Sequence, residues 1–442
     1  MDHIARDSPA RLALAVFATI IVLLTLLLQL PIATSAGHRA SLVDSFFTAT
    51  SAVCVTGLVT VDTATYWSPI GQFFIAMGMM VGGLGVMTLA SILGVAVSRR
   101  IGLTQRLLVS DETKSRLGEV GSVLRAVVVV ALTGQAILFA VLTPFFLKEG
   151  EPLLAAFWHA FFMAVSIFNN GGFVIMSEGL SPHAGDWTLS LPIILGTIVG
   201  AIGFPVLLDM WRNRRRMSKW NLTTKLTLVT YFALFFLGAL AIGVLESGNP
   251  ATLGDLSFGE KLDAAFFHSA TARSSGLSTI DVGKMNESTW FVLDALMFIG
   301  GGSASAAGGI KVTTLSVLVL AIIAEARGDR DTEAFGRRIP PDVLRVAIAA
   351  TFLGATMVGV GTLLLLQITH LPLSQVLFEV ISAFATCGLT TGITASLPAA
   401  AKWVLIALMF AGRTGTMTLA AALAIRSRRR IIRLPEERPT IG

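Results

Sequence analysis

Four segments of the chain share a residue pattern that suits the coordination of a bare cation. Each runs from a phenylalanine to a glycine ten residues later, and a Leu or Phe follows the glycine. The four pairs are Phe47 and Gly57, Phe162 and Gly172, Phe266 and Gly276, and Phe378 and Gly388. Glycine reaches backbone conformations that let successive carbonyl oxygens face one way. A ring of such oxygens can replace the hydration shell of a cation. The pattern predicts a cation pore with four contributors.

Each segment begins with a helix-like run that is too short to cross a bilayer, as in SLVDSFFTA before TSAVCVTGL (50–58). Irregular backbone at membrane depth is tolerated only where protein buries it or where it lines a water-filled cavity. Short helices that aim their negative C-terminal ends at one axis would favour a cation there. Ordinary helix breaks filled by packing are the alternative, and the repeated offset argues against it.

The composition is that of a membrane protein. Of 442 residues, 54% are hydrophobic and 14% are charged, whereas soluble domains carry about 25% charge. Apolar spans at 12–30, 122–147, 223–246 and 343–368 precede the four segments, and second spans open near Trp67, Trp187, Trp290 and Trp403. The sequence therefore predicts an all-α polytopic membrane protein. Four repeats of outer helix, pore helix, filter loop and inner helix would surround a pseudo-fourfold pore.

The net charge is +6, and the basic residues cluster at the ends of the apolar spans. The clusters are Arg99, Arg100 and Arg106; Arg212, Arg214, Arg215, Arg216 and Lys219; Arg327, Arg330, Arg337 and Arg338; and Arg426, Arg428, Arg429 and Arg430. This positive-inside pattern predicts that both termini are cytoplasmic. It gives no continuous basic face, so we expect no nucleic-acid partner. Cys54 and Cys387 form no disulfide or metal pattern.

The same reading predicts the organisation of the chain. We expect a cytoplasmic N-terminus at 1–11, repeat 1 at 12–100, a cytoplasmic connector at 101–121, repeat 2 at 122–216, repeat 3 at 217–324, a cytoplasmic connector at 325–342, repeat 4 at 343–427 and a cytoplasmic tail at 428–442.

The segments SFFTATSAVCVTGLVTVD (45–62), NNGGF (169–173), TARSSGLST (271–279) and ATCGLTTG (385–392) resemble the four filters of the Ktr/Trk/HKT superfamily of potassium transporters. The resemblance covers essentially the whole chain and is nearest to the KtrB-type membrane subunits of bacterial Ktr systems. Trk-type subunits carry an additional N-terminal helix pair with no counterpart before residue 12, which favours Ktr. Members with Ser at the first filter glycine tend to select sodium, so Gly57 implies potassium.

The resemblance implies a selectivity filter made by four short runs: Val53, Cys54, Val55, Thr56 and Gly57; Asn169, Asn170, Gly171 and Gly172; Arg273, Ser274, Ser275 and Gly276; and Ala385, Thr386, Cys387 and Gly388. Within it, K+ would be held at Val55, Thr56, Gly57, Asn170, Gly171, Gly172, Ser274, Ser275, Gly276, Thr386, Cys387 and Gly388.

A run of small residues interrupts the third inner helix, and in the family the equivalent loop is the gate. The run is Gly300, Gly301, Gly302, Ser303, Ala304, Ser305, Ala306, Ala307, Gly308 and Gly309. So many small residues do not pack as a stable helix, because each Gly costs up to about 1 kcal/mol relative to Ala. Close helix packing through small residues is the alternative. A phosphate-binding loop would need a strand–loop–helix context and a Lys-Ser/Thr ending, which the sequence lacks.

Arg413 is expected to work with this gate. It lies within the last apolar span, where an Arg costs about 2.5–3.5 kcal/mol and is by default a functional hypothesis. We predict an electrostatic barrier to cations; a structural pairing with loop carbonyls is the alternative. Arg273 is interpreted as a brace behind the filter, paired with a carboxylate such as Glu379 or Asp62.

These features predict a potassium-translocating subunit of Ktr type, not an enzyme, in a bacterial inner membrane. K+ is the expected transported ion and Na+ a candidate activator, with no nucleotide bound by this chain. The expected partners are a second copy in a homodimer, a cytosolic ring of KtrA-like nucleotide-binding subunits, and membrane lipid. Residues 99–121 and 325–341 are either docking surfaces or plain connectors. The alternatives are a Trk-type or sodium-permeable relative, or a secondary transporter with re-entrant loops.

Overall fold

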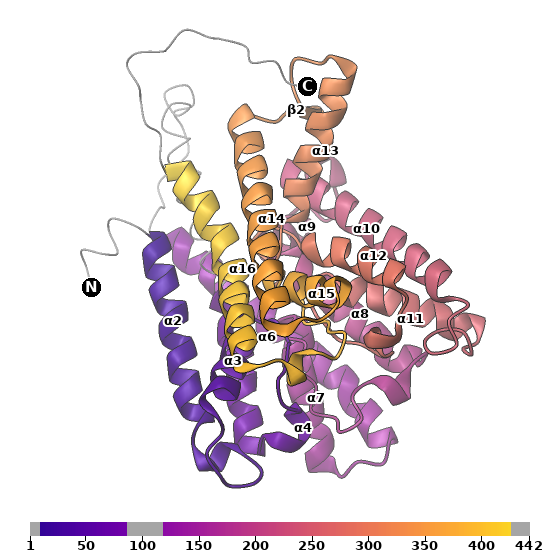
Figure 1. Ribbon diagram of the computed structural model, residues 1–442. Helices are drawn as coiled ribbons and strands as arrows, with labels where there is room; N and C mark the ends of the chain where they lie inside the picture. The colour runs from indigo at the N-terminus through magenta and orange to yellow at the C-terminus, as the bar shows by residue number, and fades with distance from the viewer. Residues whose placement is uncertain (1–8, 86–117, 426–442) are drawn as a thin grey trace.

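The computed structural model describes residues 9–85 and 118–425. Several predictions concern residues outside these ranges: the N-terminus up to residue 8, nearly all of the connector at 101–121, the tail at 428–442, and the basic clusters around Arg99 and Arg428. Both ends of the described chain, at the start of α2 (Pro9–Leu28) and the end of α16 (Ala399–Ile425), point toward the same end of the bundle (Figure 1).

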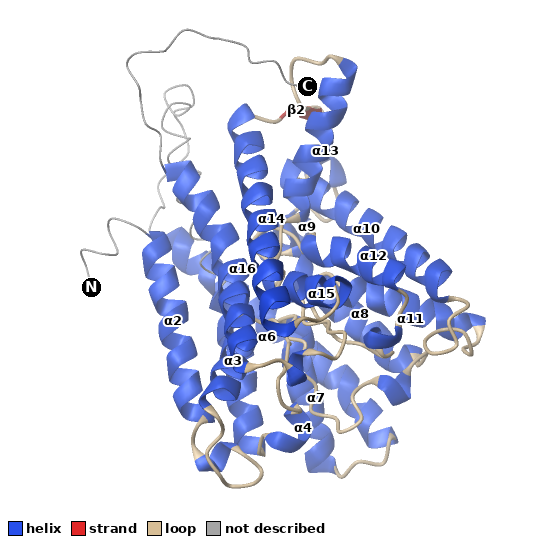
Figure 2. Ribbon diagram, in the orientation of Figure 1, coloured by secondary structure: helices blue, strands red, loops and turns tan. Residues whose placement is uncertain are grey.

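The described chain is almost entirely helical (Figure 2), which confirms the predicted class of a helical membrane protein. A two-residue hairpin, β1 (Glu333–Ala334) with β2 (Arg337–Arg338), is the only sheet in the described ranges. Together with the end of α13 (Val312–Arg327), it projects beyond the bundle at the upper end (Figure 1).

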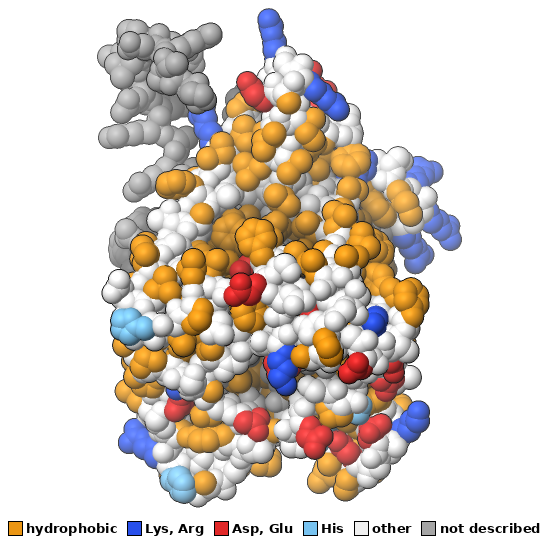
Figure 3. All heavy atoms as spheres, turned by 45° about the vertical axis from the view of Figure 1, so that its right-hand side comes forward, with side chains coloured by type: hydrophobic (Ala, Val, Ile, Leu, Met, Phe, Trp, Pro, Cys, Tyr) orange, Lys and Arg blue, Asp and Glu red, His pale blue; other side chains and the backbone are white. Residues whose placement is uncertain are grey.

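Four long helices precede the four glycine-containing segments, as predicted. They are α2, α6 (Gly118–Lys148), α10 (Leu222–Glu246) and α14 (Pro341–Thr369). Among the described residues, α6, α10 and α14 are long and apolar enough to span a bilayer. Helix α8 (Trp187–Ile202) with α9 (Phe204–Arg212) adds a fourth if the bent pair is one span. Large apolar side chains on the outer helices face outward, such as Ile137, Leu240 and Leu363. Hydrophobic side chains cover much of the face in Figure 3, with Asp and Glu gathered toward its lower end.

Four short helices follow them: α3 (Leu42–Val53), α7 (Leu153–Phe168), α11 (Phe258–Thr271) and α15 (Leu373–Phe384). Their 12 to 16 residues give a length of about 18–24 Å, which is less than the roughly 30 Å of a hydrocarbon core. Side-chain caps fix two of their starts. Ser41 accepts a hydrogen bond from the Asp44 backbone N–H, and Ser257 with Glu260 forms a capping box.

The inner helices are less regular than predicted. The first begins at Pro69, and its described part ends at Gly85. The second is bent by 94° between α8 (Trp187–Ile202) and α9 (Phe204–Arg212), with Gly203 at a φ of 100°. The sequence predicts one inner helix there. The third is split into α12 (Glu287–Phe298) and α13 by the predicted small-residue run. The fourth is α16.

Each set of long helix, short helix, loop and inner helix makes up one quarter of the chain, and the four quarters contact one another in a closed ring. Helix α8 packs on α11, α12 packs on α15, and α16 packs on α2 and α3. Between the first and second quarters, Trp158 Nε1 donates to Gln72 Oε1 at 2.9 Å. Between the fourth and first, Lys402 Nζ is 3.2 Å from Asp44 Oδ1. This closure places the C-terminal ends of the four short helices around one centre.

Candidate functional site

The four predicted glycines lie against one another at this centre. A Cβ added to Gly57 would be 2.8 Å from Gly172 Cα and 2.9 Å from the Gly171 carbonyl oxygen. The same relation repeats around the ring: the added Cβ of each glycine would meet the carbonyl oxygen of the residue before the next glycine. The further pairs are Gly172 with Ser275, Gly276 with Cys387, and Gly388 with Thr56. The carbonyl oxygens of Thr56, Gly171, Ser275 and Cys387 therefore converge in a fourfold arrangement.

The backbone that presents these oxygens is left-handed at equivalent positions. All four glycines have positive φ: 92° at Gly57, 72° at Gly172, 62° at Gly276 and 102° at Gly388. In three repeats the residue two before the glycine is left-handed as well, at Val55 (56°), Asn170 (57°) and Thr386 (48°). Such values are rare for β-branched residues such as Val55 and Thr386, so the surrounding contacts must hold this backbone in place. The third repeat has no left-handed residue at that position.

A serine six residues before the glycine holds the loop in the same three repeats. The Ser51 hydroxyl accepts from the Gly57 N–H at 3.1 Å, and the Ser382 hydroxyl accepts from the Gly388 N–H at 3.1 Å. The Ser166 hydroxyl donates to the Phe173 carbonyl oxygen at 2.8 Å. We call these three residues the serine clamps. Our sequence reading missed them, although a repeated Ser four residues after each first phenylalanine was a visible signal.

Polar side chains of the filter segments are buried without partners. Within the described chain, five of their oxygen atoms are buried and make no hydrogen bond: Thr56 Oγ1, Asn169 Oδ1, Ser274 Oγ, Ser275 Oγ and Thr386 Oγ1. A buried polar atom without a partner costs free energy, so native proteins rarely leave several together. Two of these oxygens lie against glycines of neighbouring segments, Asn169 Oδ1 against Gly83 and Thr386 Oγ1 against Gly308. The Cys54 and Cys387 thiols are free and buried in the first and fourth loops.

The prediction for the partner of Arg273 was wrong. Its guanidinium lies 3.4 Å from the centroid of the Tyr231 ring, and its Nη1 donates to the Tyr231 carbonyl oxygen at 2.6 Å. The Glu379 carboxylate instead accepts from hydroxyls in 390–394, and Asp62 caps α4 (Thr63–Tyr66). The Tyr231 ring face and carbonyl oxygen stand where a carboxylate was expected. The side chain of Arg273 therefore braces the third loop against α10 and does not line the path.

The small-residue run forms an irregular loop, 299–311, which we call the gate loop. The two ends of the loop lie side by side, because the Gly300 N–H donates to the Ile310 carbonyl oxygen at 2.9 Å. On one side it bonds to the end of α8: the Gly302 N–H donates to the Ala201 carbonyl oxygen at 2.8 Å. On the other side Gly308 lies directly against Thr386 of the fourth filter loop. The loop thus reaches from the second quarter to the fourth, next to the filter.

Two cationic side chains hold consecutive carbonyl oxygens of the gate loop. Arg413 Nη1 donates to the Ala306 carbonyl oxygen, and Lys311 Nζ donates to the Ala307 carbonyl oxygen at 2.5 Å. Arg413 is 2% exposed, and its Nε and Nη2 have no partner among the described residues. Lys311 was not singled out from the sequence, although it follows the small-residue run by two residues.

The fold and this geometry together define a helical membrane protein in which four backbone carbonyl oxygens converge at the centre. Comparison with known proteins agrees. The family model described as "TrkH: Cation transport protein" matches residues 9–430. The chain therefore belongs to the TrkH family of cation transport proteins.

Individual relatives and one solved structure are similar to this chain over most of its length. It is 37% identical to the Ktr system potassium uptake protein B of Bacillus subtilis, over 94% of this chain and 93% of that one. It is 33% identical to the potassium/sodium uptake protein NtpJ of Enterococcus hirae, over 99% and 98%. The crystal structure of the potassium transporter TrkH from Vibrio parahaemolyticus shares the fold, with a TM-score of 0.72 at 18% identity, covering 91% of this chain and 83% of that one.

Proposed function

We propose that this chain is the potassium-translocating subunit of a Ktr-type uptake system and that K+ passes through the carbonyl ring. The observation that carries the proposal is the repeated contact between each filter glycine and the carbonyl-bearing residue before the next one. Four backbone oxygens around one axis can replace water around a monovalent cation. The name of the Bacillus subtilis relative supports potassium as the ion.

Sodium is the second ion that acts on this transporter, either as a competitor of K+ or as an activator of K+ uptake. The Enterococcus hirae relative is named for both potassium and sodium. The Gly57 position favours potassium, because a side chain there would push on Gly172 and displace the oxygens that the ring requires. The number and field strength of these oxygens are one proposed basis of selectivity.

The gate loop closes the path below this ring. Its contacts with α8, with the fourth filter loop and with Arg413 support this role, because they hold a non-helical segment across the space between two quarters. The positive charges of Arg413 and Lys311 raise the energy of a passing cation, and the effect is large because the surroundings have a low dielectric constant. Opening requires these two contacts to break.

Control of the gate would come from a cytosolic KtrA-like ring, with the membrane subunit working as a homodimer in a bacterial inner membrane. Helix α13 begins one residue after Lys311 and ends at Arg327, next to the β1–β2 hairpin. A pocket of about 400 Å³ there is lined by residues that include Arg327, Asp329 and Arg330. A partner bound at this end would act on the gate loop through a rigid helix.

The test is selective uptake by purified protein in proteoliposomes, comparing wild type with Gly57→Ser and Gly392→Ser. Gly392 has a φ of 94°, close to the 92° of Gly57, but an added side chain there meets open space. It therefore controls for backbone strain alone. We expect K+ uptake by wild type and Gly392→Ser to resist competing Na+, whereas Gly57→Ser loses about tenfold in K+ preference, which corresponds to 1.4 kcal/mol. Wild-type selectivity in folded Gly57→Ser would overturn the filter assignment.

A further inference from the structure

The third filter segment lacks the support that the other three share. Ala270 occupies the position of the serine clamps, so no hydroxyl is available there. Instead, the Thr271 carbonyl oxygen at the end of α11 accepts from the Ser275 N–H at 2.9 Å and from the Gly276 N–H at 3.1 Å. The loop nevertheless places the Ser275 carbonyl oxygen against Gly172 as the ring requires. Another contact must hold the segment in position.

His268 supplies a contact from behind this segment. It lies within α11, eight residues before Gly276, and is fully buried. Its Nδ1 donates to the Ala264 carbonyl oxygen at 2.8 Å, since that atom can only accept, and this bond fixes the plane of the ring. The other nitrogen, Nε2, is 2.9 Å from the Ser278 hydroxyl. Ser278 follows Gly276 by two residues, so the imidazole bonds to the loop segment that follows the filter glycine.

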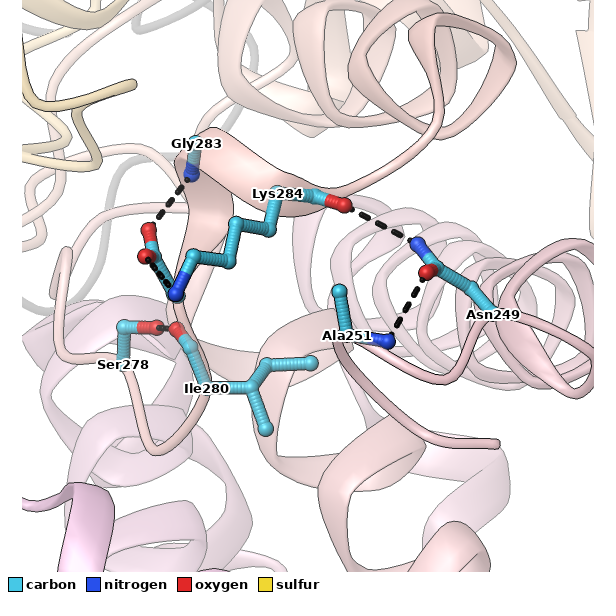
Figure 4. Close-up of polar contacts among 7 residues, drawn as sticks. Asn249, Ala251, Ser278, Ile280, Gly283 and Lys284 are labelled. Atoms are coloured by element: carbon cyan, nitrogen blue, oxygen red, sulfur yellow. Dashed lines mark hydrogen bonds and ion pairs between the residues drawn. The ribbon is translucent and has the colours of Figure 1, made fainter. Parts of the chain in front are cut away.

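Ser278 links His268 to the residues that follow the third filter segment, up to Lys284. Because Nε2 of a neutral ring that donates through Nδ1 can only accept, the Ser278 hydroxyl donates to it, and the hydroxyl shares this one hydrogen with the nearby Ile280 carbonyl oxygen (Figure 4). The next residues are fastened in turn: Asp281 accepts from the Gly283 N–H at 3.0 Å, and Asn249 Nδ2 donates to the Lys284 carbonyl oxygen at 2.9 Å (Figure 4). The segment from Gly276 to Lys284 is thus held at its outer end by the α10–α11 connection and at its inner end by His268.

We propose that His268 is a positioning residue of the third filter segment and that its hydrogen bond to Ser278 sets the place of the Ser275 and Gly276 carbonyl oxygens, and hence the preference for K+ over Na+. The bond does for this repeat what the serine clamps do for the others. In the first, second and fourth repeats the position of His268 is taken by Ala49, Ala164 and Val380, whose side chains cannot form a hydrogen bond to the segment after the filter glycine. The inference rests on the proposed function, because it assumes that the carbonyl ring selects the ion.

The test measures K+ uptake against rising Na+ in proteoliposomes for His268→Ala, His268→Gln, Ser278→Ala and the double variant His268→Ala with Ser278→Ala. We expect each Ala variant to lower the K+/Na+ preference about fivefold. The double variant should lose no more than Ser278→Ala alone, because the His268 change removes nothing further once the Ser278 hydroxyl is gone. Gln should restore most of the preference, since its amide can reach Ser278. A role in folding alone would not produce this selective rescue. His159→Ala is the control, because this pore-helix histidine contacts Glu151 and no filter residue.

Two results would overturn the inference: wild-type selectivity in folded His268→Ala, or additive losses in the double variant. If His268→Ala fails to fold, Ser278→Ala decides alone, because it removes only a part-buried hydroxyl, and wild-type selectivity in that variant rejects the proposal. Failure of the proposed function looks different, since wild type itself would then show no preference for K+.

Discussion

Neutralising the two cations of the gate loop should open the path. Arg413→Met and Lys311→Met keep side-chain length but each removes one hydrogen bond from a charged donor to a loop carbonyl oxygen. Such bonds contribute about 1.5–3 kcal/mol, and 1.4 kcal/mol is a factor of ten. Each variant should therefore shift the ratio of closed to open loop by about 10- to 100-fold toward open. Arg413→Met should also fold well, because it removes a buried cation with two unpartnered nitrogens.

The assay is the initial rate of K+ flux into proteoliposomes without any cytosolic partner, normalised to folded protein. We expect at least a tenfold rise for each Met variant and an intermediate rate for Arg413→Lys, which keeps the charge. Lys402→Met is the matched control, because this cation pairs with Asp44 at 3.2 Å, away from the gate loop. If folded Arg413→Met and Lys311→Met both show wild-type or lower flux, the two side chains do not hold the gate closed, and the reasoning fails.

Two further predictions follow from the loops. Deletion of residues 303–307 removes the Ala306 and Ala307 carbonyl oxygens, so flux should rise at least as far as in Arg413→Met and lose its dependence on the partner; unchanged flux in folded protein would contradict the gate assignment. Ser382→Ala leaves the Gly388 N–H without its 3.1 Å acceptor, which costs about 1–3 kcal/mol; melting in detergent should occur at a lower temperature and Na+ should compete better, whereas Ser374→Ala at the outer start of α15 should behave as wild type.

The sequence predicted the features that only certain residues permit. The backbone has a positive φ at Gly57 and Gly388, a conformation that favours glycine. The sequence therefore carries a glycine at a fixed distance after each phenylalanine, and this repeat was enough to locate the filter segments. The run 300–309 cannot stay helical, and the structure has an irregular loop from 299 to 311. The outer helices could be located because about 20 apolar residues are needed to cross a bilayer.

Contacts between distant segments could not be predicted in this way. Arg273 stacks on Tyr231, which is 42 residues away, and no spacing rule links the two. We expected a carboxylate because charge pairing is the usual partner for a buried Arg, but an aromatic face and a carbonyl oxygen serve here. The bend at Gly203 depends on the gate loop, since the Phe204 N–H donates to the Ala304 carbonyl oxygen at 3.3 Å. Only the assembled fold shows this contact.

The central claim is that four loops form one cation site, and anomalous diffraction from crystals grown in Rb+, a K+ substitute, tests it most directly. We predict an anomalous peak on the axis between the carbonyl oxygens of Thr56, Gly171, Ser275 and Cys387, which weakens when K+ is added in excess and is lost or displaced in Gly57→Ser. A peak that lies elsewhere, or a filter of this geometry that holds no Rb+ in wild-type crystals, would contradict the account.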